Sequence, residues 1–404
     1  MLWLSSLLLA ICRLSVVWAQ QLKEEIYSDI ENIRPCFRRM NTTHQIGCSS
    51  ETGGNVGVVL YLETEQDLQK LKNNEFAPYV VLIDPYIFNS ELLHKLEDSG
   101  LVAGVLLPNI NTGKWAEHYP RGGYSDDAPS AWNPRGQGTM WENWNFPIFY
   151  LENSTVAEHI HSCYSDHNDQ TELAWPLCSL ELKSNMYGSG DSVTCLRRSS
   201  LFSISPVRVC DPLSDDNIHY FLSPRLRETP EDKDSVIVVA AKMDALSLFD
   251  QVEVGFDSPS TGIVALLSVA NAVSKAVKNN PLYRNGIKNV LFLLIHGESF
   301  DHIGSTRLVD DMMKSGFPFN NSDPSVMEKT KNGSQPNFSL ENIHSFIELD
   351  QLSNINNNKA VYVHTNNNPG NVVRLMKENK GELRVSEVPN NLPPSSSQSF
   401  LAER

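Results

Sequence analysis

The chain has 404 residues, of which 41% are hydrophobic and 20% charged, which is ordinary for a globular protein with room for two domains. Its 48 acidic residues outnumber its 33 basic ones, so the formal net charge is −15. Because nucleic acids and anionic membranes are also negatively charged, we expect no nucleic-acid partner.

Residues 1–19 predict entry into the secretory pathway. Residues 2–10 are mostly apolar, and Val16-Val17-Trp18-Ala19 ends on small and apolar side chains before Gln20. This pattern indicates a signal peptide cleaved near Ala19, too short for a stable membrane anchor. The later apolar stretches at 101–107 and 289–295 are also too short to cross a bilayer. We therefore expect a soluble lumenal or extracellular chain after cleavage.

Cysteines and glycosylation sequons agree with that compartment. Beyond Cys12, the chain has an even number of cysteines, as suits an oxidising environment. Many connectivities are possible, but proximity in the sequence suggests three local bridges: Cys36–Cys48, Cys163–Cys178 and Cys195–Cys210. Five Asn-x-Ser/Thr sequons predict N-glycosylation at Asn41, Asn153, Asn320, Asn332 and Asn337.

The first half of the chain predicts a small α/β lobe over residues 20–215. Apolar runs at 57–62, 79–83 and 102–107 indicate buried strands, and residues 90–99 a helix with three leucines on one face. Their alternation favours a parallel sheet. Residues 113–147 are irregular and rich in tryptophan, proline and glycine. They form either a binding surface or a long loop pinned onto the core.

The second half, residues 216–404, has a stronger α/β pattern. Buried strands are expected at 235–241, 289–295 and 345–349, and helices at 262–277 and 305–314. A parallel sheet covered on both faces follows from this order, with functional residues at the carboxyl ends of its strands. Those ends carry polar side chains: Lys242, Asp244, Asp257, Glu298, Ser299 and Asp350.

The order of these residues resembles the zinc-dependent aminopeptidase family. The resemblance implies a site where His, Asp and Glu hold two zinc ions, and where a further Glu takes a proton from the bridging water. It places Asp257 as the bridging ligand, Asp350 as a ligand and Glu298 as the base, with Asp244 outside the ligand set. The last histidine of the pattern would lie beyond Arg404, and residues 399–404 read as an interrupted helix, so we expect a truncated chain.

Two positions depart from this family's pattern. Lys242 stands where the ligand histidine is expected, and Ser299 where a ligand glutamate is expected. An ammonium group has no lone pair and repels a dication, so we predict no metal, no cofactor and no catalysis. Lys242 could instead pair with Asp257 or Asp350, although a weak site for a harder ion at those carboxylates is conceivable.

A second resemblance is more specific. Residues 297–305 read Gly-Glu-Ser-Phe-Asp-His-Ile-Gly-Ser and are similar to the Gly-Glu-x-Phe-Asp-Tyr-Ile-Gly-Ser motif of the nicastrin family, with His302 replacing the tyrosine. Further likeness is found at 36–39, 44–50, 132–134, 146–150, 210–213 and 392–396. It implies a lid at 113–147, a large lobe that is a pseudo-peptidase, and a parent type I membrane glycoprotein. The implied partners are presenilin, the other γ-secretase subunits and the N-terminal stubs of type I membrane substrates.

Two interpretations of the 297–305 motif stay open at this stage. Glu298, with His302, Asp257 and Asp350, could contact a substrate's amino terminus, or Glu298 could cap the helix that begins near 301–304. For the whole chain, a substrate-gating and assembly subunit is favoured over a working metallo-aminopeptidase and over a secreted glycoprotein with an adhesion or folding role.

Overall fold

The structure is a computed structural model. It describes residues 27–41, 45–73, 75–109, 136–169, 175–184, 186–187, 191–199, 210, 212–223, 232–245, 247–249, 252, 255–280, 288–314, 317, 338–352, 359–366, 371–389 and 392–403. The predicted signal peptide, most of the segment 113–147 and the sequons at Asn320, Asn332 and Asn337 lie outside these residues. The described chain divides into two compact units.

The N-terminal unit is built on a six-stranded sheet with the order β1-β7-β6-β5-β4-β8. Its four inner strands are parallel, and the two edge strands are antiparallel to their neighbours. The strands are β1 (Ile33–Pro35), β4 (Asn55–Leu62), β5 (Tyr79–Ile83), β6 (Val102–Pro108), β7 (Ile148–Leu151) and β8 (Ser179–Leu182). The helices are η1 (Glu65–Asn73), α2 (Ser90–Ser99) and α3 (Ser154–His167).

Local signals explain the elements of this unit. Strand β5 is buried at every position, as its unbroken apolar run predicts for a strand covered on both faces. Helix α2 begins where the Asn89 side chain accepts the Leu92 N–H, and ends at Gly100 in the left-handed region. Its leucines at 92, 93 and 96 are fully buried, so this helix is held chiefly by packing.

Disulfides join neighbouring cysteines in both units. Cys36–Cys48 and Cys163–Cys178 lie in the N-terminal unit, and Cys195–Cys210 ties helix α4 (Ser192–Ser199) to the residues that follow it. These are the three pairs that proximity in the sequence suggested. A two-stranded sheet of β2 (Arg38–Met40) and β3 (Gln45–Gly47) lies within the first of these loops.

The described end of the tryptophan-rich segment is anchored by packing. Trp144 is fully buried, with its ring 4.8 Å from that of His94 and 6.2 Å from that of Phe146. The short helix η3 (Thr139–Trp141) precedes it. For residues 143–147 this favours the interpretation of a loop pinned onto the core, while Trp115 and Trp132 lie outside the described residues.

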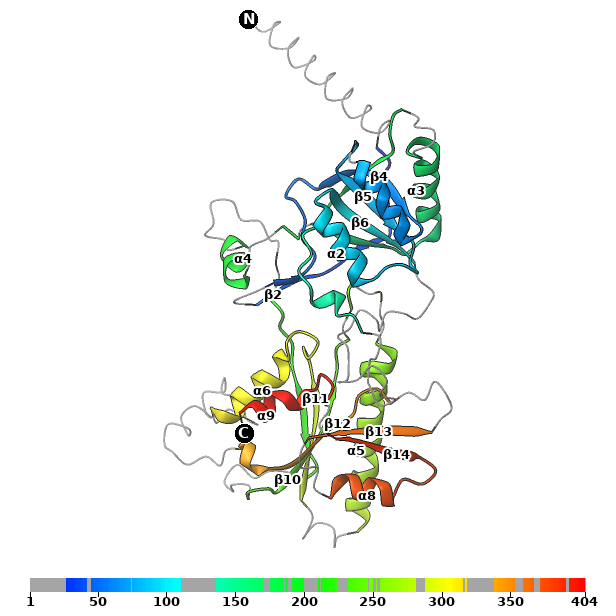
Figure 1. The fold of residues 1–404 in the computed structure, drawn as a ribbon. Helices are drawn as coiled ribbons and strands as arrows, with labels where there is room; N and C mark the ends of the chain where they lie inside the picture. Colours follow the sequence, from blue (N-terminus) through cyan, green and yellow to red (C-terminus); the bar gives the residue numbers. More distant parts are fainter. Residues whose placement is uncertain are drawn as a thin grey trace, which may run out of the picture. The chain divides into compact units, whose positions relative to one another are not determined.

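The C-terminal unit is built on a four-stranded sheet with the order β12-β10-β11-β9 (Figure 1). Central β10 (Val236–Lys242) is parallel to β11 (Asn289–Ile295) and β12 (Ile343–Glu348), and β9 (Ile218–Phe221) is an antiparallel edge strand. Helix α5 (Thr261–Asn279) follows the π-helical turn η4 (Phe256–Ser260), and α6 (Ile303–Met313) follows β11. Further elements are η6 (Leu340–Asn342), β13 (Ala360–Thr365), α8 (Val372–Glu378), β14 (Arg384–Pro389) and α9 (Ser397–Ala402).

Alternate residues of β10 supply the two cores of this unit. Val236, Val238 and Ala240 face a core shared with α6 and Phe400 of α9, whereas Val239 and Ala241 face a core shared with Leu266 of α5. This is the period-two alternation of a strand between two layers. In Figure 1, α6 and α9 accordingly lie on one side of the sheet and α5 on the other. The predicted α/β class and all of the predicted strands and helices are confirmed.

Helix α5 is the most apolar long helix in the described part of the C-terminal unit. Residues Asp257–Asn279 are long and apolar enough to cross a membrane by length and composition alone, with a mean hydropathy of 1.4. In the fold this helix packs on the sheet through Gly262 and Leu266. A Cβ at Gly262 would collide with the carbonyl oxygen of Leu349, so glycine there permits the close approach.

Candidate functional site

The predicted polar residues gather at one edge of the C-terminal sheet. Lys242 is the last residue of β10, Glu298 and Ser299 follow β11, and Asp350 follows β12. Because β10, β11 and β12 are parallel, their carboxyl ends meet at the same edge. The structure therefore brings together residues that are far apart in the sequence.

Lys242 forms an ion pair at this edge. Its Nζ lies 3.2 Å from Oδ2 of Asp350, and the two side chains are 21% and 26% exposed. Ser258 Oγ donates to Oδ1 of Asp350, so both carboxylate oxygens of Asp350 have a partner. Of the two pairings considered for Lys242, the structure shows the one with Asp350. The ammonium group at the position where the sequence resemblance predicts a ligand histidine is therefore paired with Asp350.

Asp257 is held next to this pair through its backbone. Thr261 Oγ1 donates to the carbonyl oxygens of Asp257 and Asp350, and the Leu352 N–H donates to the same hydroxyl. These contacts fix the loop before α5 against the end of β12.

Glu298 is buried, with 6% of its surface exposed, and its carboxylate faces the first turn of α6. Oε1 accepts the Ser305 N–H at 2.7 Å, while Oε2 lies 3.0 Å from Ser305 Oγ and 3.1 Å from His302 Nδ1. The first N–H groups of a helix have no partner within the helix, and a negative charge is favoured there. Glu298 therefore supplies the N-terminal cap that the sequence left as one of two possibilities.

Asp244 fixes the backbone that carries Glu298. Its two carboxylate oxygens accept the N–H groups of Glu298 at 2.9 Å and of Ser299 at 2.7 Å. The turn also needs the left-handed region at Gly297, Asp301 and His302, with φ of 77°, 59° and 54°. Asp244 thus stabilises the turn after β11, a role that the resemblance to aminopeptidases does not predict.

Glu348 is the residue that sequence reasoning missed. The hydroxyls of Ser395 and Ser396 and the Ser396 N–H all donate to its carboxylate, the last at 3.0 Å. Burial raises the pKa of Glu348, an effect that the Ser395 hydrogen bond opposes and the nearby Asp350 strengthens. A glutamate that ends a buried strand, together with the Ser395-Ser396-Ser397 run, was the available signal.

A contact between two serines links helix α6, which Glu298 caps, to helix α9, which follows the partners of Glu348. Ser305 Oγ, which donates to Glu298, lies 2.8 Å from Ser399 Oγ on α9. Glu298 therefore holds the start of α6, Glu348 holds the start of α9, and the two helices meet between them. Phe400 completes the contact, with its ring 4.6 Å from that of Phe346 on β12.

The donor set does not fit a pair of zinc ions. Within the described residues no group of three or more His, Cys, Asp or Glu side chains is placed to hold a metal ion. Lys242 forms an ion pair with the carboxylate of Asp350. Ser299 has a hydroxyl where a zinc ligand would need a carboxylate, and this hydroxyl donates to the Asp244 carbonyl oxygen.

His302 makes the stability of this unit depend on pH. The hydrogen bond with Glu298 raises the pKa of His302. Burial of the ring lowers this pKa, and the nearby Glu348 carboxylate raises it further. The stabilisation from the charged pair is complete below the ordinary value of 6.5 and is lost as pH rises through the raised pKa. Urea unfolding should give a lower free energy at pH 9 than at pH 6. Asparagine tolerates the positive φ of residue 302 but carries no titratable ring, so the His302→Asn variant should lack that decline. An equal decline in the parent and the variant would contradict a stabilising charged pair between His302 and Glu298.

Comparison with known proteins identifies the family. The family model of the nicastrin small lobe matches residues 35–188, and that of the nicastrin large lobe matches residues 235–404. Human nicastrin is 34% identical over 98% of this chain and 58% of its own length. The chain belongs to the nicastrin family. Nicastrin of Dictyostelium purpureum is 25% identical over 94% of the chain and 59% of its own length, so the chain spans a little over half of these relatives.

A solved nicastrin shares the fold. The crystal structure described as that of the γ-secretase component nicastrin aligns with a TM-score of 0.65 and 24% identity, over 94% of this chain and 66% of that one. The resemblance of residues 297–305 to the nicastrin motif is thus part of a likeness that extends through both lobes.

Proposed function

We propose that this chain is the lumenal part of a non-catalytic subunit of γ-secretase that acts in substrate recruitment and complex assembly. Its membership of the nicastrin family supports a place in the γ-secretase complex. The Lys242–Asp350 ion pair at 3.2 Å is the observation that supports a non-catalytic role. The expected partners are presenilin, the other subunits and the N-terminal stubs of type I membrane substrates.

Hydrolysis of peptides would require groups that are committed elsewhere. A general base must be free to take a proton from water, but the Glu298 carboxylate already accepts from Ser305 and lies against His302. A bridging water must be activated by metal ions, but the Lys242 ammonium group, which has no Lewis acidity, pairs with the Asp350 carboxylate that a metal ion would need. The same contacts favour capping by Glu298 over its direct contact with a substrate amino terminus.

Association with presenilin tests this proposal. The chain, fused to a membrane anchor and expressed with the other γ-secretase subunits in cells that lack their own nicastrin, should co-precipitate presenilin from mild detergent. An unrelated glycosylated ectodomain on the same anchor is the control. Recovery of presenilin at the level of that control would contradict the proposal and favour a role outside the complex.

A further inference from the structure

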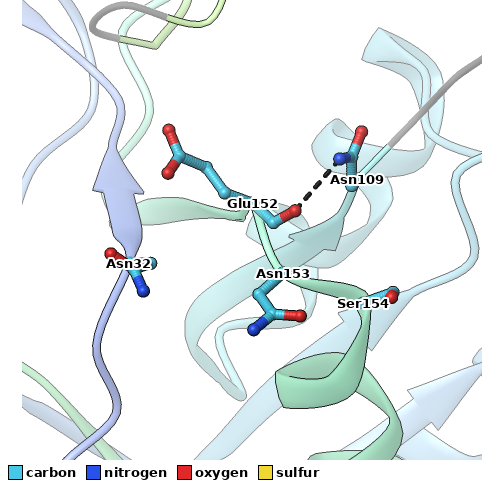
Figure 2. Close-up of a pocket in the computed structure, with 5 residues that line it drawn as sticks. All are labelled: Asn32, Asn109, Glu152, Asn153 and Ser154. Carbon is cyan, nitrogen blue, oxygen red and sulfur yellow. Dashed lines mark hydrogen bonds between the residues drawn. The ribbon is translucent and has the colours of Figure 1, made fainter.

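A polar pocket lies in the N-terminal unit beside the start of α3. It has a volume of about 400 Å³ and is lined by Asn32, Asn109, Glu152, Asn153 and Ser154. Figure 2 shows Asn153 between Asn32 on one side and Asn109 and Ser154 on the other. The volume is in the range of small-molecule sites, about 300–1,000 Å³, but the lining is made of amide, hydroxyl and carboxylate groups instead of apolar ones.

Asn153 is the acceptor residue of the sequon Asn153-Ser154-Thr155 and is exposed. Its Oδ1 accepts the Thr155 N–H at 3.0 Å and lies 2.9 Å from Thr155 Oγ1, so it caps α3. These two bonds fix the orientation of the carboxamide. They leave Nδ2, the atom to which a glycan is attached, without a hydrogen bond to any described residue.

The walls of the pocket are suited to a neutral polyhydroxyl ligand. Asn109 is held rigidly, because its Nδ2 donates to the Glu152 carbonyl oxygen at 3.0 Å and its Oδ1 accepts from Tyr150 at 2.6 Å. The Glu152 carboxylate is paired with Arg34 at 2.9 Å. The Asn32 carboxamide forms no hydrogen bond within the described part of the chain, and it can both donate to and accept from a sugar.

The sequon predicts an N-linked glycan on Asn153, and on that basis we propose that this pocket seats the first sugar of the glycan, an N-acetylhexosamine, against Asn32 and Asn109. The donor is a lipid-pyrophosphate-linked oligosaccharide of the secretory pathway. In the transfer Nδ2 forms a bond to C1 of the sugar and gives up one proton, while the bond from C1 to the pyrophosphate oxygen breaks and the lipid pyrophosphate leaves with the electron pair. The sugar then starts at the pocket, because Nδ2 belongs to a residue that lines it.

Glycan occupancy is the first test. The full chain is secreted from eukaryotic cells and treated with a glycan amidase in heavy-oxygen water, and peptide mass spectrometry then reads the mass shift at Asn153. Most molecules should carry the shift. The Thr155→Ala variant should lose it, and the matched Ser154→Ala variant, which keeps the sequon, should retain it. An unmodified Asn153 in the parent chain would overturn the proposal.

Seating of the sugar is tested by the rate at which the amidase releases the glycan from the folded chain. Asn32→Gly removes one wall without strain, because Asn32 has a φ of 60° that glycine adopts freely. Release from the folded variant should be about fivefold faster than from the folded parent, as expected for the loss of one or two hydrogen bonds. In denaturant both chains should release at the same rate. Equal rates for the two folded chains, or a parent whose folded and denatured rates agree, would overturn the seating.

Discussion

Replacing Glu298 with alanine is expected to lower the free energy of unfolding of the C-terminal unit by about 2–4 kcal/mol. The variant leaves the Ser305 N–H at the buried start of α6 without its acceptor, and it removes the partner of His302. A buried donor that loses its partner costs its full desolvation free energy, and a charged acceptor makes the lost hydrogen bonds stronger than neutral ones. Urea unfolding followed by circular dichroism measures the change.

Two further variants separate capping from a general effect of charge. Glu298→Gln keeps an oxygen that can accept the Ser305 N–H, so it should lose only about 1 kcal/mol. Asp311→Ala removes a partly exposed carboxylate on the same helix, paired with Arg307, and should change stability by less than about 1 kcal/mol. Glu298→Ala with parental stability would show that Glu298 is not structural and would return it to the set of groups available to a substrate.

Gly304→Ala is expected to have a comparable or larger effect. Gly304 is buried in the first turn of α6, where an added Cβ would collide with the carbonyl oxygen of His296 and crowd Ile295. Backbone cannot yield as a flexible side chain does, so α6 must move away from β11 and from Glu298. We expect a loss of about 3 kcal/mol or more from this overpacking, measured by the same unfolding experiment.

Gly53→Ala is the matched control, because a Cβ there meets nothing within 4 Å and its φ is not positive. That variant should be neutral or slightly stabilising. If Gly304→Ala unfolded at the same urea concentration as Gly53→Ala, the close packing of α6 against the end of β11 at His296 would be contradicted.

The central strands of both sheets were predictable from the sequence because they are largely buried. Unbroken apolar runs of strand length, such as 79–83 and 289–295, indicate buried strands, and the spacing of the leucines between 90 and 99 indicates a helix with one buried face. The antiparallel edge strands β1, β8 and β9 were not predicted. Strand β9 exposes both Ile218 and Tyr220, and β1 has only three residues, so neither has a periodic apolar pattern that could be read.

The candidate site was predictable as a set of residues but not as a set of contacts. Parallel strands bring Lys242, Glu298 and Asp350 to one edge, and the order of elements sufficed to infer this. The choice between capping and substrate contact for Glu298 depends on where the Ser305 N–H points, which only the three-dimensional structure gives. Glu348 was missed because its partners, Ser395 and Ser396, lie far along the chain with no regular spacing to connect them.

The zinc content of the purified full chain tests most directly whether this site is structural and non-catalytic. The chain is secreted, incubated with excess zinc, freed of unbound metal by gel filtration and measured by elemental mass spectrometry. Because Lys242 pairs with Asp350 and Ser299 offers no carboxylate, we predict well below one zinc ion per chain. About two tightly held zinc ions per chain, as a co-catalytic site requires, would contradict the account and make peptidase activity the leading hypothesis.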